Sequence, residues 1–362
     1  MSALRREIEN LIASEGPIGI DRYMALALGH PVHGYYVTRD PLGAAGDFIT
    51  APEISQMFGE LLGLWAAAIW DMMGRPAPFI LAELGPGRGT LMADALRAAG
   101  RLPGFLDSCA VHLVETSPAL RARQQAALAG HTVTWHESAG DLPGGPLLLL
   151  ANEFLDALPI RQFVRGEGGW HERLVGLSET GLAFGLAPHT TSDLDGTAGR
   201  PGDLLEICPA ARSLADSLAR RLAASGGAAL FVDYGPREGE LGDSFQAVRR
   251  HGFADPLADP GEADLTAHVR FGALARIARR AGAAAQGPVG QGEFLAALGI
   301  RERAVALARG RDETTSRAVA AALARLTGPK EMGELFKVLA ISDPRLGPLP
   351  GFPPGDASLR AG

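Results

Sequence analysis

Cysteine, lysine and long apolar runs are all scarce in this chain of 362 residues. The two cysteines, Cys109 and Cys208, are too few for a disulfide scaffold or for a zinc site built from thiolates. The nine histidines do not gather at metal-ligand spacing; the closest pair is His30 and His33, in a segment rich in proline and glycine. We therefore expect no metal site and a reducing compartment.

Further absences bear on where the chain works. Its most apolar stretch, Leu61–Trp70, has ten residues, whereas a membrane-spanning helix needs ~20. The first sixteen residues contain three glutamates and no apolar core of a signal peptide. A formal net charge of -7 argues against a nucleic-acid surface, which normally carries a basic excess. We expect a cytoplasmic protein with no membrane insertion and no nucleic-acid partner.

What the chain does contain is an alternation of short apolar segments with helical segments. Length alone favours one enlarged domain or two domains. Strands are predicted over residues 79–84, 110–115, 132–135, 146–151, 228–234 and 333–341, and helices over 91–99, 118–128 and 271–281. This order predicts a parallel, doubly wound α/β sheet with right-handed crossovers.

The remaining segments read as additions to that sheet domain, which we expect to span residues 79–291 and 331–343. Residues 1–78 are helical, with Thr50 and Glu53 at the spacing of a capping box before an apolar helix over 53–73. Residues 161–187 predict an antiparallel β insert, and residues 292–330 a helical insert that forms a lobe with residues 1–78. Residues 344–362 are rich in proline and glycine and predict a poorly ordered tail.

The sharpest local signal is a glycine turn after the first strand. Gly85, Gly87 and Gly89 have the spacing G-x-G-x-G, which lets a backbone turn sharply and approach a ligand. A turn that only improves packing explains the pattern about as well. Thr90 stands where the dinucleotide fingerprint needs a third glycine, so nicotinamide cofactors are disfavoured.

Two groups of acidic residues follow later strands. Glu115 ends the second strand, where a carboxylate accepts hydrogen bonds from ribose hydroxyls; alone, a solvated strand end would be the better reading. Asn152, Glu153 and Asp156 follow the fourth strand, where ligands of open α/β sheets bind. The alternative for these three residues is an N-cap with ordinary first-turn acidic residues.

Five motifs resemble the MidA family of class I methyltransferases that use S-adenosylmethionine. They span residues 46–60, 83–90, 151–160, 265–268 and 332–338. The resemblance implies a mostly parallel seven-stranded sheet. It also implies a protein substrate, because the mitochondrial members look like arginine methyltransferases acting on a subunit of respiratory complex I.

The same resemblance implies a set of site residues. The cofactor would contact Gly85, Pro86, Gly87, Gly89 and Glu115, under a cover made by Asp47, Phe48 and Thr50. Phe48 is equally well explained as a core aromatic. Arg270 departs from the family pattern, in which an acidic residue is expected.

For the acceptor, Glu153 and Asp156 could clamp a guanidinium through bidentate hydrogen bonds, with Asn152 beside them. The predicted function is a methyltransferase that modifies arginine on a complex I subunit or another protein. The alternatives are an assembly chaperone that binds the cofactor without catalysis and, less favoured, a nicotinamide oxidoreductase.

Overall fold

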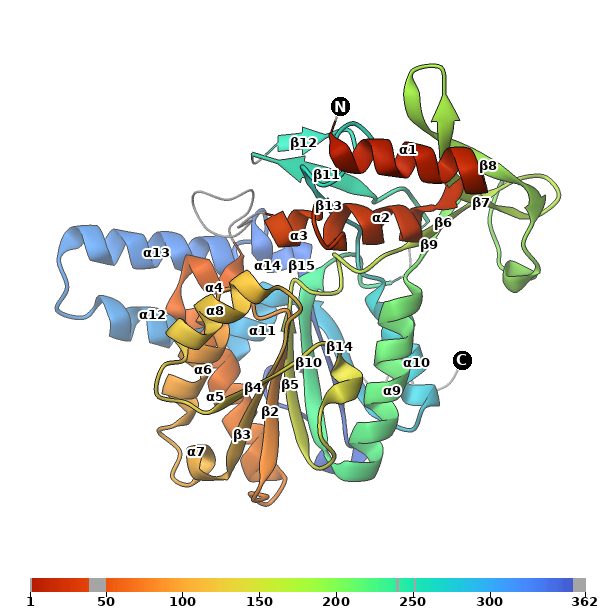
Figure 1. The fold of residues 1–362 in the computed structure, drawn as a ribbon. Coiled ribbons are helices and arrows are strands. Elements are labelled where there is room, and N and C mark those ends of the chain that lie inside the picture. Colours follow the sequence, from red (N-terminus) through yellow and green to blue (C-terminus); the bar gives the residue numbers. More distant parts are fainter. Residues whose placement is uncertain (1, 39–49, 239–240, 251, 354–362) are drawn as a thin grey trace. The chain divides into compact units, whose positions relative to one another are not determined.

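The computed structural model describes residues 2–38, 50–238, 241–250 and 252–353. The chain forms two compact units, each built from separate stretches of sequence (Figure 1). The first unit comprises Met1–Phe48, Asp156–Arg212 and Glu240–His268. The second unit comprises Ile49–Leu155, Ser213–Gly239 and Val269–Gly362.

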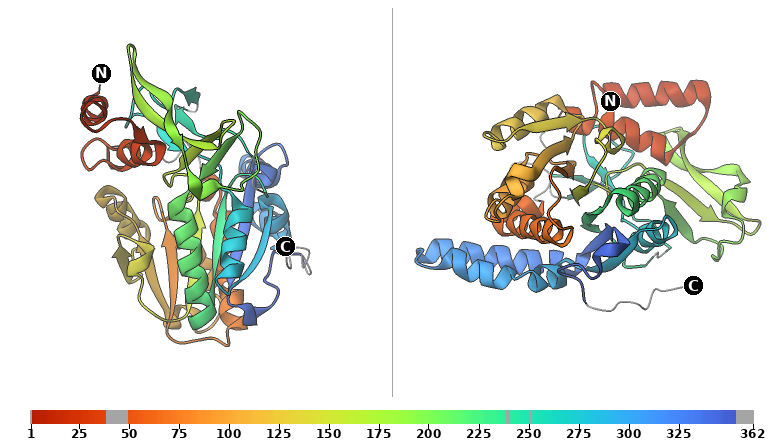
Figure 2. Two further views of the ribbon diagram at one scale, coloured as in Figure 1. Left: turned by 90° about the vertical axis from the view of Figure 1, so that its right-hand side faces the viewer. Right: turned by 90° about the horizontal axis from the view of Figure 1, so that it is seen from below.

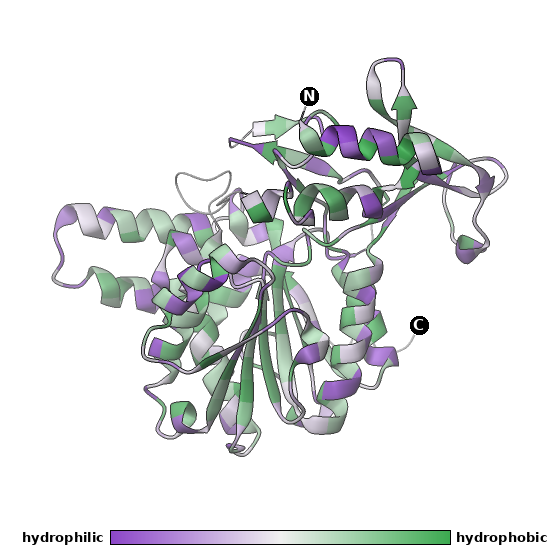
Figure 3. Ribbon diagram, in the orientation of Figure 1, coloured by the Kyte–Doolittle hydropathy of each residue, from purple (hydrophilic) through white to green (hydrophobic). Residues whose placement is uncertain are grey.

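A seven-stranded sheet forms the centre of the second unit. In spatial order its strands are β14 (Ala284–Gly290), β15 (Phe336–Ser342), β10 (Gly227–Tyr234), β5 (Leu147–Asn152), β2 (Phe79–Leu84), β3 (Cys109–Val114) and β4 (Val133–His136). Only β15 pairs antiparallel to its neighbours; the other pairings are parallel. The predicted mostly parallel, seven-stranded α/β sheet is therefore confirmed. Strands β2, β5 and β10 in the middle of the sheet are nearly continuous apolar runs because helices cover both faces (Figure 3).

Helices on the two faces enclose this sheet. They are α4 (Ala51–Ile54), α5 (Gln56–Met72), α6 (Thr90–Ala99), α7 (Phe105–Ser108), α8 (Pro118–Ala127), α10 (Phe271–Arg280) and the part of α9 (Pro209–Ser225) from residue 213 onward. Side chains of α5 and α6 share one buried core with alternate residues of the strands. Figure 2 shows α9 and α10 along the opposite face.

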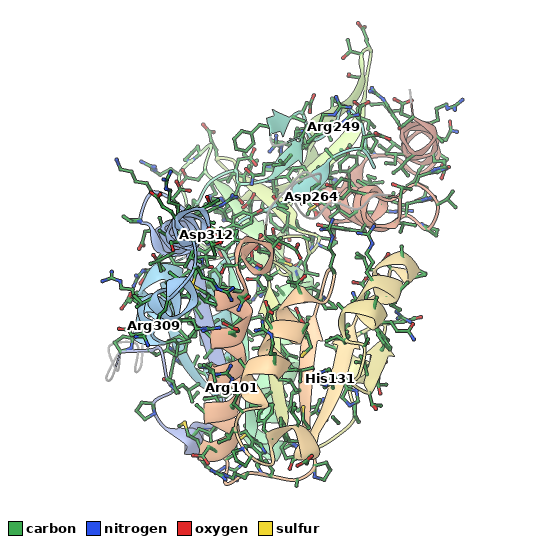
Figure 4. The ribbon with its side chains drawn as sticks, turned by 90° about the vertical axis from the view of Figure 1, so that its left-hand side faces the viewer. Arg101, His131, Arg249, Asp264, Arg309 and Asp312 are labelled. Carbon is green, nitrogen blue, oxygen red and sulfur yellow. The ribbon has the colours of Figure 1, made fainter. Side chains whose placement is uncertain are left out.

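The second unit continues into a helical extension. It consists of α11 (Gln291–Ala297), α12 (Ile300–Ala308), α13 (Glu313–Thr327) and α14 (Met332–Leu335). Arg309 and Asp312 lie at the turn between α12 and α13 (Figure 4). The buried Glu60 of α5 accepts hydrogen bonds from Arg303 of α12 and Arg97 of α6, at 2.6 Å each. Because a buried charge needs such partners, this cluster holds three helices together.

The first unit combines helices with two antiparallel sheets. Its helices are α1 (Ala3–Glu15), α2 (Ile20–Gly29) and α3 (Tyr35–Thr38). One sheet contains β1 (Ile18–Gly19), β6 (Arg161–Arg165), β7 (Trp170–Ser178), β8 (Gly181–Thr190) and β9 (Leu204–Ile207), and the other contains β11 (Gln246–Arg249), β12 (Gly252–Ala254) and β13 (Asp264–Thr266). Apolar side chains of α1 and α2 pack with residues of β7, β11 and β13 in a core of their own.

Three segments differ in detail from the sequence analysis. The apolar helix expected over residues 53–73 is divided at Ser55, which has extended dihedral angles and caps α5 by accepting from Met57 N. Thr50 does precede α4, but its side chain makes no capping hydrogen bond, and Glu53 bonds Thr90 instead. Residues 284–290 form β14, which their glycine and proline content had hidden.

The domain boundaries also fall differently. The expected helical segment 1–78 is shared between the units, and residues 292–326 belong to the second. Residues 344–353 of the expected loose tail pack, with Leu349 and Phe352 buried and Pro350 O accepting from the Trp65 indole at 3.2 Å. Across the described ranges, the structure contains no helix whose length and apolarity would suit a membrane span.

The close contact of α5 with α6 gives a stability prediction. A Cβ at Gly63 would lie 2.3 Å from Ala95 O and 2.5 Å from Ala95 Cα, so both backbones must shift. We expect Gly63→Ala to lower the free energy of unfolding by about 1–3 kcal/mol, measured by urea titration. Gly144→Ala is the control, because its Cβ would meet nothing within 4 Å. Equal stability of the two variants would show that the helices have room to separate.

Candidate active site

The glycine turn connects β2, which lies between β5 and β3 in the sheet, to α6. Gly85, Gly87 and Gly89 all have positive φ, at 60°, 52° and 85°, which other residues rarely adopt. A Cβ on Gly85 would lie 2.9 Å from the ring of Phe154, and one on Gly89 would lie 3.2 Å from Gln124 Cα. The turn therefore needs glycine both for its dihedral angles and for its close neighbours. Pro86 O closes it by accepting from Gly89 N at 2.7 Å.

The turn lies where the strand order reverses. From β2 the chain moves outward to β3 and then β4, whereas β5 pairs with the other edge of β2. In parallel sheets the carboxyl ends of strands on either side of such a switch point leave room for a ligand. The turn, Glu115 after β3 and Asn152 with Glu153 after β5 share this edge within the second unit.

Glu83 precedes the turn with its side chain buried. The carboxyl group accepts a hydrogen bond from Met92 N in the first turn of α6. Among the described residues its Oε2 atom has no hydrogen-bond partner. Burial raises the pKa of Glu83 to about 8, so this carboxyl group is largely protonated at neutral pH.

Glu115 follows β3, and both its carboxylate and its backbone carbonyl accept hydrogen bonds. Its Oε1 atom accepts from Ser117 N at 2.8 Å and its Oε2 atom from Gln124 Nε2 at 3.1 Å. Its backbone carbonyl accepts from Arg121 Nε at 2.8 Å. Burial raises the pKa of this carboxyl group above its usual value, although the hydrogen bonds from Ser117 and Gln124 oppose the shift. The side chain is therefore oriented before any ligand binds.

Asn152 ends β5 and Glu153 follows it in a strained conformation. Glu153 has φ 49°, in the left-handed region that a non-glycine residue adopts only when its surroundings enforce it. Its Oε1 atom accepts from Asn152 Nδ2 at 3.0 Å and from Ala51 N at 3.1 Å. The buried Asn152 Oδ1 atom has no hydrogen-bond partner within the described ranges.

Helix α4 forms hydrogen bonds with the segments that follow β5 and β2. Its first backbone N–H, at Ala51, donates to Glu153 as described, and Glu53 Oε1 accepts from Thr90 Oγ1 at 2.6 Å. Thr50, the predicted cover residue, immediately precedes this helix and is partly buried. The other two predicted cover residues, Asp47 and Phe48, lie outside the described residues.

Asp156 belongs to the first unit, unlike Glu153. It is buried, and its carbonyl oxygen accepts from Ala267 N at 3.0 Å. Within that unit Tyr36 donates its hydroxyl to Asp264 Oδ1 at 2.7 Å (Asp264 is labelled in Figure 4). Burial, with the charges of Asp264 and Asp156, raises the pKa of Tyr36 well above its usual value. Arg270, the departure from the family pattern, precedes α10 in the second unit and is partly exposed.

Two residues near these strand ends were missed in the sequence analysis. Asp233 near the end of β10 is buried and accepts from Phe154 N, Leu155 N and Tyr234 N, so it fixes the loop after β5. A lone carboxylate at the end of an apolar strand was the signal for it. Gln124 of α8 is fully buried and bonds Glu115, but one amide in a helix gives no comparable signal.

Comparison with known proteins gives concordant similarities. A family model for S-adenosyl-L-methionine-dependent methyltransferases matches residues 61–289. The mitochondrial protein arginine methyltransferase NDUFAF7 of Xenopus laevis is 38% identical over 374 residues, covering 94% of this chain and 84% of the relative. NDUFAF7 of Homo sapiens is 38% identical over 370 residues, with 94% and 83% covered.

Two solved structures from Burkholderia thailandensis share the whole architecture. One, bound to S-adenosyl-homocysteine, superposes with a TM-score of 0.83 at 31% identity, covering 96% of this chain and 94% of the other. The second has a TM-score of 0.84 at 32% identity, with 98% and 96% covered. These similarities extend over nearly the entire chain and agree with the resemblance found from its motifs.

The raised pKa of Glu83 predicts a pH dependence of stability. Its pKa is about 8 in the folded chain against 4.5 for an exposed glutamate, so between these pH values the folded state holds a proton that the unfolded state releases. Stability from this group is therefore present below pH 4.5 and is lost as the pH rises towards 8. Glu83→Gln should flatten that loss in urea titrations at pH 5 to 8, whereas the exposed control Glu137→Gln should not. An unchanged slope would mean that Glu83 is ionised in the folded protein.

The glycine turn predicts a loss of cofactor binding. Gly85→Ala places a methyl group against Phe154 in an unfavourable backbone conformation, so the turn must rearrange. We expect the dissociation constant for S-adenosylhomocysteine in calorimetry to rise at least tenfold. The control is Gly130→Ala, which has an equally unfavourable φ of 99° but an open surrounding and precedes β4. Similar affinity in both variants would place the ligand elsewhere.

Proposed function

We propose that this chain, which belongs to the family of S-adenosyl-L-methionine-dependent methyltransferases, methylates an arginine side chain of a protein partner. The cofactor follows from the family. The acceptor class rests on relatives named protein arginine methyltransferases that align with 94% of the chain. The observation that carries the proposal in this structure is the strained Glu153 after β5, whose carboxylate accepts from Ala51 N at the start of α4.

The residues at this sheet edge fit S-adenosylmethionine. In the turn of Gly85, Pro86, Gly87 and Gly89, Cβ atoms at Gly85 and Gly89 would meet neighbouring residues, and Gly89, the N-cap residue of α6, has no side chain to occupy the N-terminus of that helix. We assign these residues to the methionine end of the cofactor and the pre-oriented carboxylate of Glu115 to its ribose. Thr50, next to α4, is assigned to the cover. The same role for Asp47 and Phe48 is proposed from the sequence.

For the acceptor we assign Asn152 and Glu153. When bound, S-adenosylmethionine supplies a methyl group on a sulfonium that an attacking nitrogen can displace. The task of the protein is then to hold a guanidinium so that one nitrogen faces the methyl group, because orientation supplies most of the acceleration in such a step. The Glu153 carboxylate can accept charge-assisted hydrogen bonds from a guanidinium, and the buried Asn152 Oδ1 atom can accept another.

Asp156 was assigned the second position of this clamp from its spacing to Glu153, and that role remains a sequence-based proposal. The partner is proposed to be a subunit of respiratory complex I, on the strength of the family resemblance. Mass spectrometry of complex I subunits from cells with and without the gene tests the partner directly. A methylated arginine that disappears with the gene is expected, and an unchanged pattern in every subunit would contradict the partner.

The clamp itself is tested by Glu153→Gln. Glutamine keeps an oxygen that can accept from Ala51 N but removes the charge that orients the acceptor. We expect single-turnover methylation to fall by about two to three powers of ten, with cofactor affinity retained. Asp156→Asn should act in the same direction.

The control is Asp141→Asn, because Asp141 Oδ2 accepts from Ser138 N at 2.9 Å in a purely local capping box. It should lower stability by about 1 kcal/mol or less and leave methylation intact. If Glu153→Gln behaves like this control, the carboxylate only caps α4 and the acceptor binds elsewhere.

A further inference from the structure

Gln124 joins three parts of the cofactor site through its buried side chain. Its Nε2 atom donates to Gly87 O at 2.8 Å and to Glu115 Oε2 at 3.1 Å, and its Oε1 atom accepts from Trp135 Nε1 at 2.8 Å. The residue has no exposed surface. One amide thus connects the glycine turn after β2, the carboxylate after β3 and the indole of β4.

The orientation of this amide is unambiguous. An indole N–H can only donate a hydrogen bond, so the oxygen of Gln124 must face Trp135. Both hydrogens of the amide nitrogen then point to acceptors, the Gly87 carbonyl and the Glu115 carboxylate. Helix α8 approaches the turn closely at this place, since a Cβ on Gly89 would lie 3.2 Å from Gln124 Cα.

We infer that Gln124 is a positioning residue that holds the Glu115 carboxylate at a set separation from the glycine turn, so that ribose and methionine ends of the cofactor are bound together. The inference rests on the proposed contacts of Glu115 and Gly87 with the cofactor. A carboxylate that must accept two ribose hydroxyls needs one rotamer, and Gln124 and Ser117 N each occupy one of its oxygens from the protein side. The remaining lone pairs of the Glu115 carboxylate can then accept hydrogen bonds from the two ribose hydroxyls.

Gln124 also acts on the charge of Glu115. A hydrogen bond donated to a carboxylate favours the ionised form, and the bond from Gln124 lowers the pKa of Glu115 against the effect of burial. Arg121, the cation bonded to the Glu115 carbonyl, acts in the same direction. Loss of the amide should therefore raise the pKa of Glu115 and shift the low-pH decline of cofactor affinity to higher pH.

The test is calorimetric binding of S-adenosylhomocysteine to the full chain carrying Gln124→Met, which keeps the volume but removes all three hydrogen bonds. We expect affinity to fall roughly 10- to 100-fold, the effect of one hydrogen bond to a charged group. In a Glu115→Ala background the same substitution should change affinity by less than about threefold, because the carboxylate that Gln124 positions is already absent.

The matched control is Gln291→Met. Gln291 is also fully buried, and its Nε2 atom donates to Leu326 O at 2.8 Å, remote in sequence from the turn. Both variants should lose thermal stability, but only Gln124→Met should lose affinity and shift the pH profile. Equal affinity in the two variants, or full loss from Gln124→Met when Glu115 is already alanine, would overturn the inference.

The two proposals fail differently. If Glu115→Ala binds S-adenosylhomocysteine as tightly as the wild type, the ribose contact is wrong and the inference falls with it. If Glu115→Ala is weakened while Gln124→Met is not, the ribose contact stands and Gln124 is only a structural residue.

Discussion

The constraint on which the site depends is the passage of the backbone from a strand buried on both faces into a helix within five residues. The backbone can change direction over so short a distance because Gly85, Gly87 and Gly89 adopt positive φ. At Gly85 and Gly89 a side chain would also meet Phe154 or Gln124, so the turn exposes its backbone at these positions only because they are glycines. Glu115 after β3 and Asn152 with Glu153 after β5 place polar side chains at the same edge of the sheet. Gln124 bonds Glu115, Ala51 N bonds Glu153, and Asp233 fixes the loop after Glu153 by accepting from Leu155 N.

Burial raises the pKa of two carboxyl groups close to this turn, but hydrogen bonds oppose the effect to different extents. Glu83 is buried with one backbone donor, and its pKa rises to about 8, so it adds little negative charge to the sheet edge at neutral pH. Glu115 receives donors at both oxygens, which oppose the effect of burial. The hydrogen bonds thus favour the charged form of Glu115, whereas Glu83 has a single backbone donor to oppose the effect of its burial. Two adjacent parallel strands can carry acidic residues for different purposes in this way.

The parts of this structure that could be predicted from the sequence are those with one dominant local signal. Strands such as β2 and β5 are continuous apolar runs bounded by glycine or polar residues, so their positions were predicted to within a residue or two. β14 was not predicted because Gly287 and Pro288 are untypical of a strand. The break at Ser55 was not predicted because apolar residues occur on both sides of it. The pairing of Glu153 with Asp156 rested on spacing alone, and the structure assigns these residues to different compact units. Gln124 could not be found, because its role depends on three partners that only the fold brings together.

The chemistry available at the site follows from what its side chains cannot do. A covalent route would need a nucleophile, and the two thiols are unsuited to it: burial raises the pKa of Cys109 to about 12 and also raises that of Cys208. Methyl transfer from a sulfonium needs no such group, because the acceptor atom can displace the sulfide directly. Catalysis then depends on how narrowly donor and acceptor are oriented. The strained Glu153 and the Glu115 carboxylate, which accepts from Ser117 N and Gln124, are both fixed by the protein itself, so their orientation costs nothing further when a ligand binds.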